Sequence, residues 1–177
     1  LGKFIEDFKI LAPTTKIRLI GHSLGSQVIL SSIEYLARKK QNIGIIESVY
    51  LFGASITADT PSKKYGKILQ NIINKKIVNH YAPTDDVLNW ADKEKFVKGP
   101  LGLNGATGKS ISKYYQKLVK PKNHRFASYI KTLKSFPWFV LCFFDIFKTY
   151  ISYVLFIRII GLGSIQIKIK YFQIFVQ

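Results

Sequence analysis

The sequence predicts an α/β fold in which helices flank a mostly parallel sheet. Short β-branched runs such as "KIRLI" and "ESVYLFGAS" alternate with segments whose apolar side chains recur at helical spacing. Strands that alternate with helices pair in parallel, because each crossover helix returns the chain to the same end of the sheet. The 177 residues are 47% hydrophobic, which is enough apolar material for one core.

A helix comes first, followed by a strand, a turn and a second helix. Residues 2–11 place four apolar side chains at helical spacing: Phe4, Ile5, Phe8 and Leu11. The stretch "APTTK" ends that helix, and "KIRLI" then predicts a strand bounded by Gly21. From Ser26 the next helix presents one apolar face: Ile29, Ile33, Leu36 and Ala37. The basic residues 38–40 suit its C-terminus.

The alternation continues beyond this helix. Three further segments are predicted as strand, weakly periodic helix and strand in turn: 47–55, 62–76 and 76–83. The glycine-rich residues 97–118 predict a long loop with room for one short element. Residues 123–133 predict a loop that leads into a last helix.

The composition changes at residue 136, where we place a domain boundary. Residues 1–135 form the predicted α/β domain, and residues 136–177, with eight of the thirteen phenylalanines, form a hydrophobic tail. Residues 136–157 are long enough to span a bilayer, but one acidic and one basic residue near their centre offset the insertion energy of their apolar side chains. Three interpretations stay open: a membrane-embedded tail, a buried or interfacial amphipathic segment, and a segment that is not native. The alternation in residues 164–177 predicts a half-buried strand.

The net charge of +17 indicates a strongly basic surface. Nucleic acid and an anionic membrane surface are the partners that such a charge attracts. The lysines are scattered and accompany no nucleic-acid-binding motif, so a solvated basic surface is favoured, an anionic membrane surface stays open, and no nucleic acid partner is expected. The single Cys142 can form no intramolecular disulfide, which fits a reducing compartment. With no leader visible, we expect a cytoplasmic or membrane-associated protein that is not secreted.

Residues 21–25, "GHSLG", match the pattern Gly-x-Ser-x-Gly that presents the nucleophile of many serine hydrolases. Such a short match also arises by chance, and a strand-to-helix turn capped by serine would explain it. The apolar strand before it and the amphipathic helix after it are the context that a nucleophile elbow requires. We therefore predict that Ser23 is a nucleophile and that the Leu24 backbone N–H belongs to an oxyanion hole. The other elbow residues are Gly21, His22 and Gly25.

A serine nucleophile needs a histidine base, and the chain has three histidines. His22 adjoins Ser23 in the turn, where we expect its side chain to point elsewhere. His80 lies inside a predicted strand and is expected to be a packed histidine. His124, in the loop before the last helix, is the predicted base, with a surface histidine as the alternative.

The acid should follow the serine and precede the histidine, at the C-terminal end of a strand. Asp85 and Asp86 both stand directly after the third predicted strand. Because adjacent carboxylates cannot both point into one site, we expect the other to be solvated or to support the following helix. Asp85 and Asp86 therefore both stay open as the acid, and Asp59, in the loop after the second predicted strand, is a reserve candidate.

Four stretches together resemble the α/β-hydrolase superfamily: "IGHSLGSQVI", "ESVYLFGAS", "IVNHYAPTDDVL" and "NHRFASY". Within it, the chain is similar to the poorly characterised branch that includes the transmembrane and coiled-coil domain proteins. That branch has a strand that ends in Tyr, followed by a polar turn, an Asp and an apolar pair. Here the Tyr corresponds to Tyr81, the Asp to Asp85 and the apolar pair to residues 87–88. The resemblance covers residues 1–135. It implies a hydrolase architecture, frequent membrane association and no particular substrate. It also implies Asp85 as the acid, which makes Asp86 a further reserve candidate.

The sequence departs from this superfamily at its start. The hydrolase fold places several strands, and the loop with a second oxyanion N–H, before the elbow, yet only 15 residues precede "KIRLI". We therefore expect the C-terminal half of such a fold. We also expect this chain by itself to hydrolyse p-nitrophenyl esters no faster than its Ser23→Ala variant.

The predicted function is hydrolysis of a small-molecule or lipid carboxyl ester by Ser23, His124 and Asp85, without a metal or organic cofactor.

Residues 102–110, "GLNGATGKS", are similar to a phosphate-binding loop, but Leu103 stands where that loop requires glycine, so no nucleotide is expected. The alternative is a non-catalytic, membrane-associated protein that keeps the scaffold for interaction.

Overall fold

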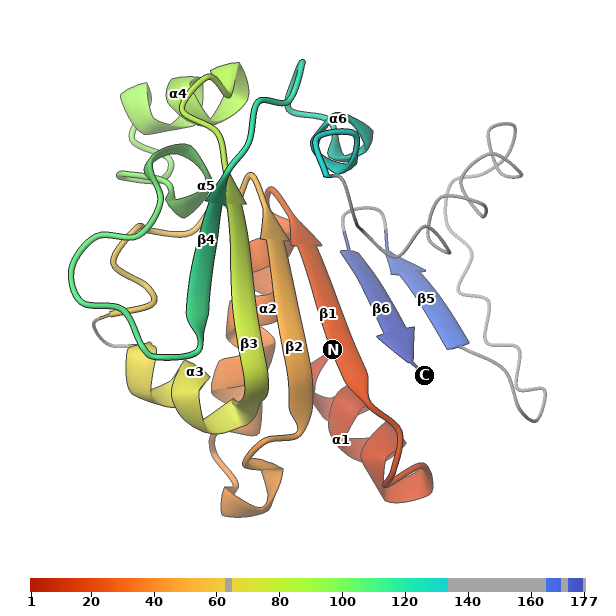
Figure 1. Cartoon of the computed structure of the whole chain (residues 1–177). Coiled ribbons are helices and arrows are strands. Elements are labelled where there is room, and N and C mark those ends of the chain that lie inside the picture. Colours follow the sequence, from red (N-terminus) through yellow and green to blue (C-terminus); the bar gives the residue numbers. More distant parts are fainter. Residues whose placement is uncertain (63–64, 134–164, 170–171, 177) are drawn as a thin grey trace.

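The chain forms a six-stranded sheet in the order β4-β3-β2-β1-β6-β5 (Figure 1). The computed structural model describes residues 1–62, 65–133, 165–169 and 172–176. Four strands pair in parallel: β1 (Ile17–His22), β2 (Ile46–Phe52), β3 (Ile73–Tyr81) and β4 (Tyr114–Leu118). Strands β5 (Ile165–Ile169) and β6 (Phe172–Val176) are antiparallel to each other, and β6 is antiparallel to β1. The predicted α/β fold with a mostly parallel sheet is confirmed.

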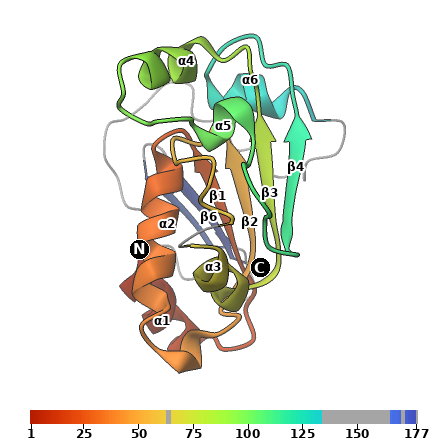
Figure 2. The same ribbon diagram turned by 90° about the vertical axis from the view of Figure 1, so that its left-hand side faces the viewer.

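The helices form two groups. Helices α1 (Gly2–Leu11), α2 (Gly25–Leu36) and α3 (Gly66–Ile72) cover one face of the sheet, as Figures 1 and 2 show. Helices α4 (Asp86–Lys93), α5 (Leu101–Asn104) and α6 (Phe126–Ile130) lie at the C-terminal ends of the parallel strands (Figure 1). A short 3₁₀ turn, Lys40–Asn42, joins α2 to β2. Loops at this end of a parallel sheet are the usual place for a functional site.

The period-two geometry of β1 places neighbouring side chains in two different cores. Leu19 belongs to the larger core, between the sheet and helices α1 to α3, whereas Ile20 belongs to a smaller core with Tyr129 on the other face. The predicted apolar face of α2 is confirmed, because Ile29, Ile33 and Leu36 are buried in the larger core. The smaller core packs Tyr129 and Ile130 of α6 against Ile20 of β1, Phe52 of β2 and Ala82, which follows β3.

Several element boundaries differ from the predictions. Residues 97–118, predicted as a loop, contain α5 and the edge strand β4. Strand β4 was missed because four of its five residues are exposed, so no hydrophobic alternation marks it. Strand β3 begins at Ile73, three residues before the predicted start. The strand predicted in residues 164–177 is a pair of strands, β5 and β6.

The interpretations of residues 136–157 lie outside the described residues. In the part of the chain that the structure describes, no helix is both long and apolar enough to cross a membrane.

Candidate active site

The turn between β1 and α2 holds Ser23 in a backbone conformation that is unusual for serine. Its φ is +53°, whereas residues other than glycine rarely adopt positive φ because of steric cost. The surrounding backbone fixes it there: the Ser23 N–H donates to the Phe52 carbonyl (3.1 Å), and its own carbonyl accepts from the Ser26 hydroxyl (2.6 Å) and the Ser55 N–H (3.3 Å). The predicted strand, tight turn and helix are therefore present, with local strain at the serine.

The glycines of the turn allow β1 and α2 to approach closely. A Cβ at Gly21 would lie 2.7 Å from the Ile29 side chain and 3.2 Å from the Ser26 backbone nitrogen, so a larger residue would push the helix away. Gly25 is buried as the first residue of α2. Leu24 stands at the N-terminal end of α2 with an exposed side chain, and among the described residues its backbone N–H donates to no protein acceptor. That N–H is available to a ligand beside Ser23.

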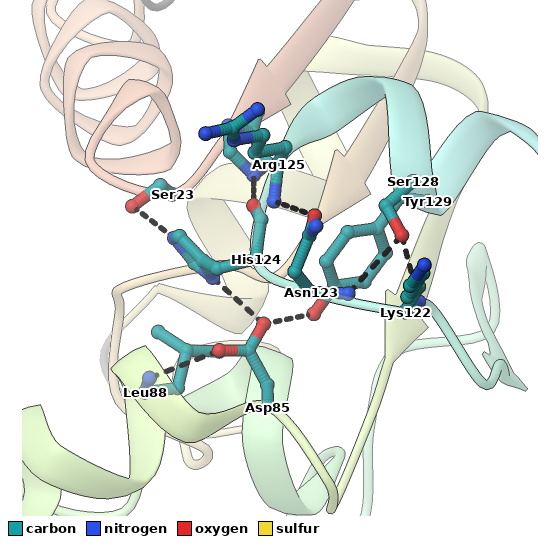
Figure 3. Close-up of polar contacts among 10 residues, drawn as sticks. Ser23, Asp85, Leu88, Lys122, Asn123, His124, Arg125, Ser128 and Tyr129 are labelled. Carbon is teal, nitrogen blue, oxygen red and sulfur yellow. Dashed lines mark hydrogen bonds and ion pairs between the residues drawn. The ribbon is translucent and has the colours of Figure 1, made fainter.

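Three of the predicted residues form one chain of hydrogen bonds (Figure 3). The Ser23 hydroxyl donates to Nε2 of His124 (2.8 Å), and Nδ1–H of His124 donates to Oδ2 of Asp85 (2.7 Å). Ser23 lies in the turn after β1, His124 in the loop before α6 and Asp85 in the turn after β3. They meet at the C-terminal ends of the parallel strands. The geometry assigns the tautomer of His124 with the proton on Nδ1.

Asp85 serves both His124 and helix α4. Its side chain is completely buried, and Oδ1 accepts the Leu88 N–H (3.1 Å), which caps the helix. Burial raises the pKa of Asp85, but hydrogen bonds from His124, a tyrosine and the Leu88 N–H outweigh it and hold the pKa below its ordinary value. As expected for the other carboxylate of the pair, Asp86 is an exposed residue of the first turn of α4. Asp85 itself also caps this helix, which was not expected.

Asp59, the other reserve acid, lies in the loop after β2. Its carboxylate accepts the Thr57 hydroxyl (2.6 Å), and it is not one of the residues that contact His124 in the described part of the chain.

Tyr129 completes the surroundings of Asp85 and was missed by the sequence analysis. Its hydroxyl donates to Oδ2 of Asp85 (2.5 Å), its side chain is fully buried, and burial together with the neighbouring carboxylate raises its pKa. Gly53 makes this contact sterically possible, because a Cβ there would lie 2.8 Å from the Tyr129 oxygen and 3.3 Å from the His124 ring. The Asp85 oxygen that faces His124 therefore accepts two hydrogen bonds.

His22 also belongs to the site, contrary to the expectation that its side chain points elsewhere. Its Nε2–H donates to the backbone carbonyl of His124 (2.6 Å), and the two imidazole rings pack at a centroid distance of 4.8 Å. Burial and the nearby His124 lower the pKa of His22 to about 4, so the ring is neutral near pH 7. His22 thus fixes the backbone of the predicted base from the residue next to Ser23.

His80 is packed in the core, as predicted. Its ring stacks on Phe52 at a centroid distance of 4.4 Å, and Nδ1–H donates to the Leu51 carbonyl (3.2 Å). Burial lowers the pKa of His80 to about 4.

A hydroxyl joined to a neutral imidazole whose other nitrogen donates to a buried carboxylate can lose its proton to that imidazole. The carboxylate then stabilises the imidazolium that forms. Among the residues that the structure describes, no three His, Cys, Asp or Glu side chains are grouped so as to hold a metal ion.

Comparisons with known proteins give partial matches. Residues 13–97 match a family model described as "Protein of unknown function (DUF726)". The chain is 35% identical over 74 residues to an uncharacterised membrane protein of Caenorhabditis elegans, and 36% identical over 86 residues to the probable lipase MIL1 of Saccharomyces cerevisiae. These alignments cover 42% and 48% of this chain, but only 12% and 8% of the relatives' own lengths. No solved structure matches the chain significantly.

The family match covers only part of the candidate site. It contains Ser23 and Asp85 but ends before His124, which lies in the loop that leads to α6. The geometry, not the matched family, therefore associates His124 with the other two residues.

Proposed function

We propose that the chain is a serine hydrolase that cleaves carboxyl esters, with Ser23 as nucleophile, His124 as general base and Asp85 as the carboxylate that orients it. The observation that carries the proposal is the hydrogen-bond chain from the Ser23 hydroxyl through both nitrogens of His124 to a completely buried Asp85. The positive φ of Ser23 supports it, because strain of this kind persists where the surroundings impose it and is concentrated at functional sites.

In this mechanism the Ser23 oxygen attacks the ester carbonyl carbon while Nε2 of His124 takes the hydroxyl proton. Ionised Asp85 stabilises the resulting imidazolium through Nδ1–H. The Leu24 N–H, at the positive end of α2, donates to the oxygen that becomes negative in the tetrahedral intermediate. His124 then returns the proton to the leaving alkoxide, and water hydrolyses the acyl enzyme by the same steps.

The substrate that we propose is a small-molecule or lipid carboxyl ester. The partial similarity to a protein named as a probable lipase supports an acyl ester over a peptide. The similarity to a protein named as a membrane protein supports the second candidate function, a membrane-associated protein that uses this scaffold without catalysis.

A fluorophosphonate probe tests the proposal, because it phosphonylates only serines that a base activates. Labelling is the readout rather than ester turnover, since we expect slow turnover from this chain by itself. We expect mass spectrometry to locate the probe on Ser23, with no adduct in Ser23→Ala. Ser31→Ala, which changes an exposed serine of α2, is the matched control and should label like the unchanged chain.

The variant Asp85→Asn distinguishes a loss of serine reactivity from a loss of folding. Asparagine can still cap α4, but it favours the wrong tautomer of His124, so labelling should fall by on the order of 10⁴-fold while circular dichroism stays unchanged. Equal labelling rates in the unchanged chain, Asp85→Asn and His124→Ala would refute catalysis and favour the second candidate function.

A further inference from the structure

Several exposed apolar side chains belong to the elements at the end of the sheet that carries Ser23. Helix α4 lies above the N-terminal end of α2 at this end of the sheet (Figure 2). The exposed apolar residues of these two helices and of the turn after α4 are Leu24, Val28, Val87, Trp90 and Phe96, and we call them the rim surface. Large exposed apolar side chains that occur together mark a contact surface, whereas single ones need no explanation.

Trp90 and Phe96 form a preorganised pair within the rim surface. They are 56% and 70% exposed, yet their ring centroids lie only 5.3 Å apart. The backbone fixes the pair, because the Phe96 N–H donates to the Ala91 carbonyl (2.9 Å) and Lys95 turns the chain with a φ of +61°. Two aromatic rings are therefore held together in water, without a protein partner among the described residues to cover them.

Lysines lie beside this surface and predominate farther along the chain. Three exposed lysines lie beside the aromatic pair in the sequence: Lys93, Lys95 and Lys98. Three acidic residues on α4 and directly after it balance their charge: Asp86, Asp92 and Glu94. The balance shifts beyond Glu94, because residues 95–133 contain nine basic residues and no acidic one. Three of those lysines, Lys120, Lys122 and Lys131, line a concave surface between the end of β4 and α6, next to the loop that carries His124. The end of the sheet with Ser23 thus combines exposed aromatic rings with an excess of lysine.

We propose that the rim surface docks on an anionic phospholipid bilayer, with the Trp90 and Phe96 rings at the boundary between headgroups and acyl chains. Aromatic side chains favour this boundary, and lysines beside them are attracted by anionic headgroups. Charge complementarity favours this occupant over an apolar groove of another protein. Docking would place the Ser23 turn against the bilayer, so the ester class that the proposed hydrolase meets is a membrane lipid. The docking itself does not depend on the proposed function.

Trp90 can report its own position. The chain has two tryptophans, so a Trp138→Phe background leaves Trp90 as the single fluorophore. This chain, carrying Ser23→Ala to prevent turnover, is mixed with vesicles of 70% phosphatidylcholine and 30% phosphatidylglycerol. We expect a blue shift of Trp90 emission and quenching by lipids brominated near the headgroup end of the acyl chain. Binding without quenching would mean that another segment, such as the hydrophobic tail, contacts the lipid, and would overturn the proposal.

Paired variants measure the contribution of each feature by vesicle cosedimentation. Trp90→Ala with Phe96→Ala should weaken binding by about 10- to 100-fold, because each ring is expected to bury roughly half of its surface in lipid. The matched control is Ile10→Ala with Leu11→Ala at the C-terminal end of α1, where both side chains are more exposed than the aromatic pair, and this variant should bind normally. Neutralising Lys93, Lys95 and Lys98 to glutamine should weaken binding by about fivefold per lysine.

Two results would overturn the docking proposal: equal loss of binding in the aromatic pair and its control, or equal binding to vesicles of phosphatidylcholine alone. Because binding is measured on Ser23→Ala, a failure of fluorophosphonate labelling would refute the proposed hydrolase and leave this result unaffected.

Discussion

Tyr129→Phe removes one hydroxyl from the centre of the site and leaves the aromatic ring in place. The hydroxyl donates to Oδ2 of Asp85, the oxygen that also accepts from His124. The variant thus changes the hydrogen bonding of a buried carboxylate without creating a large cavity. It tests whether Tyr129 holds Asp85 in its ionised form.

The expected cost follows from the burial of Asp85. Because the carboxylate is completely buried, water cannot replace the lost donor, and a hydrogen bond to a charged group contributes about 1.5–3 kcal/mol. We expect the free energy of unfolding at pH 7 to fall by that amount, and the pKa of Asp85 to rise. The folded pKa of Asp85 is lowered, so the stability it contributes is present above its unfolded pKa of about 3.9 and is lost as the pH falls through the folded value. The difference between Tyr129→Phe and the unchanged chain should therefore shrink below about pH 4.

Urea unfolding followed by circular dichroism at pH 7 and pH 3 measures this difference. Tyr115→Phe removes a hydroxyl from an exposed ring on β4 and should change stability by less than about 0.5 kcal/mol. Equal stability of Tyr129→Phe and the unchanged chain at pH 7 would refute the role of the hydroxyl. A loss of the same size at both pH values would assign the effect to packing instead of charge.

Three further predictions concern the backbone and the other histidines. Ser23→Gly relieves the positive φ, so we expect the free energy of unfolding in urea to rise by about 1 kcal/mol, with no rise in Ser23→Ala. A Cβ in Gly102→Ala would meet a backbone nitrogen at 2.0 Å, so the same assay should show a loss of about 3 kcal/mol or more. Gly99→Ala, with open space but a φ of +58°, should lose only about 1 kcal/mol. His22 and His80, with folded pKa values of about 4, should destabilise the fold as the pH falls from about 6.5 to about 4, and NMR titration of their ring protons should give those low values.

Local sequence patterns were enough to predict most of the sheet. The runs that became β1, β2 and β3 are apolar because both faces of a central parallel strand are buried, and such runs are visible without tertiary information. Strand β4 is specified by its pairing with β3, not by its own burial, so its residues "YYQKL" carry no pattern that distinguishes them from a loop.

In the candidate site, too, local sequence patterns predicted some residues, whereas others depend on tertiary packing. The Gly-x-Ser-x-Gly motif, chain order and position at strand ends were enough to select Ser23, His124 and the pair Asp85 and Asp86, and the family resemblance favoured Asp85. The structure brings Ser23, His124 and Asp85 into hydrogen-bond contact. The contacts of Tyr129 and His22 depend on how α6 packs over the sheet, and no spacing in the sequence records that packing. The sequence offered one general clue, Gly53 directly after β2, because glycine permits the positive φ and the close approach to Tyr129 that the structure shows there.

The double use of Asp85 limits how the site can open. One carboxylate oxygen anchors the first turn of α4 and the other anchors His124, so the helix cannot swing away without releasing the imidazole. The position of helix α4 and the orientation of the His124 ring are therefore coupled through one side chain, that of Asp85.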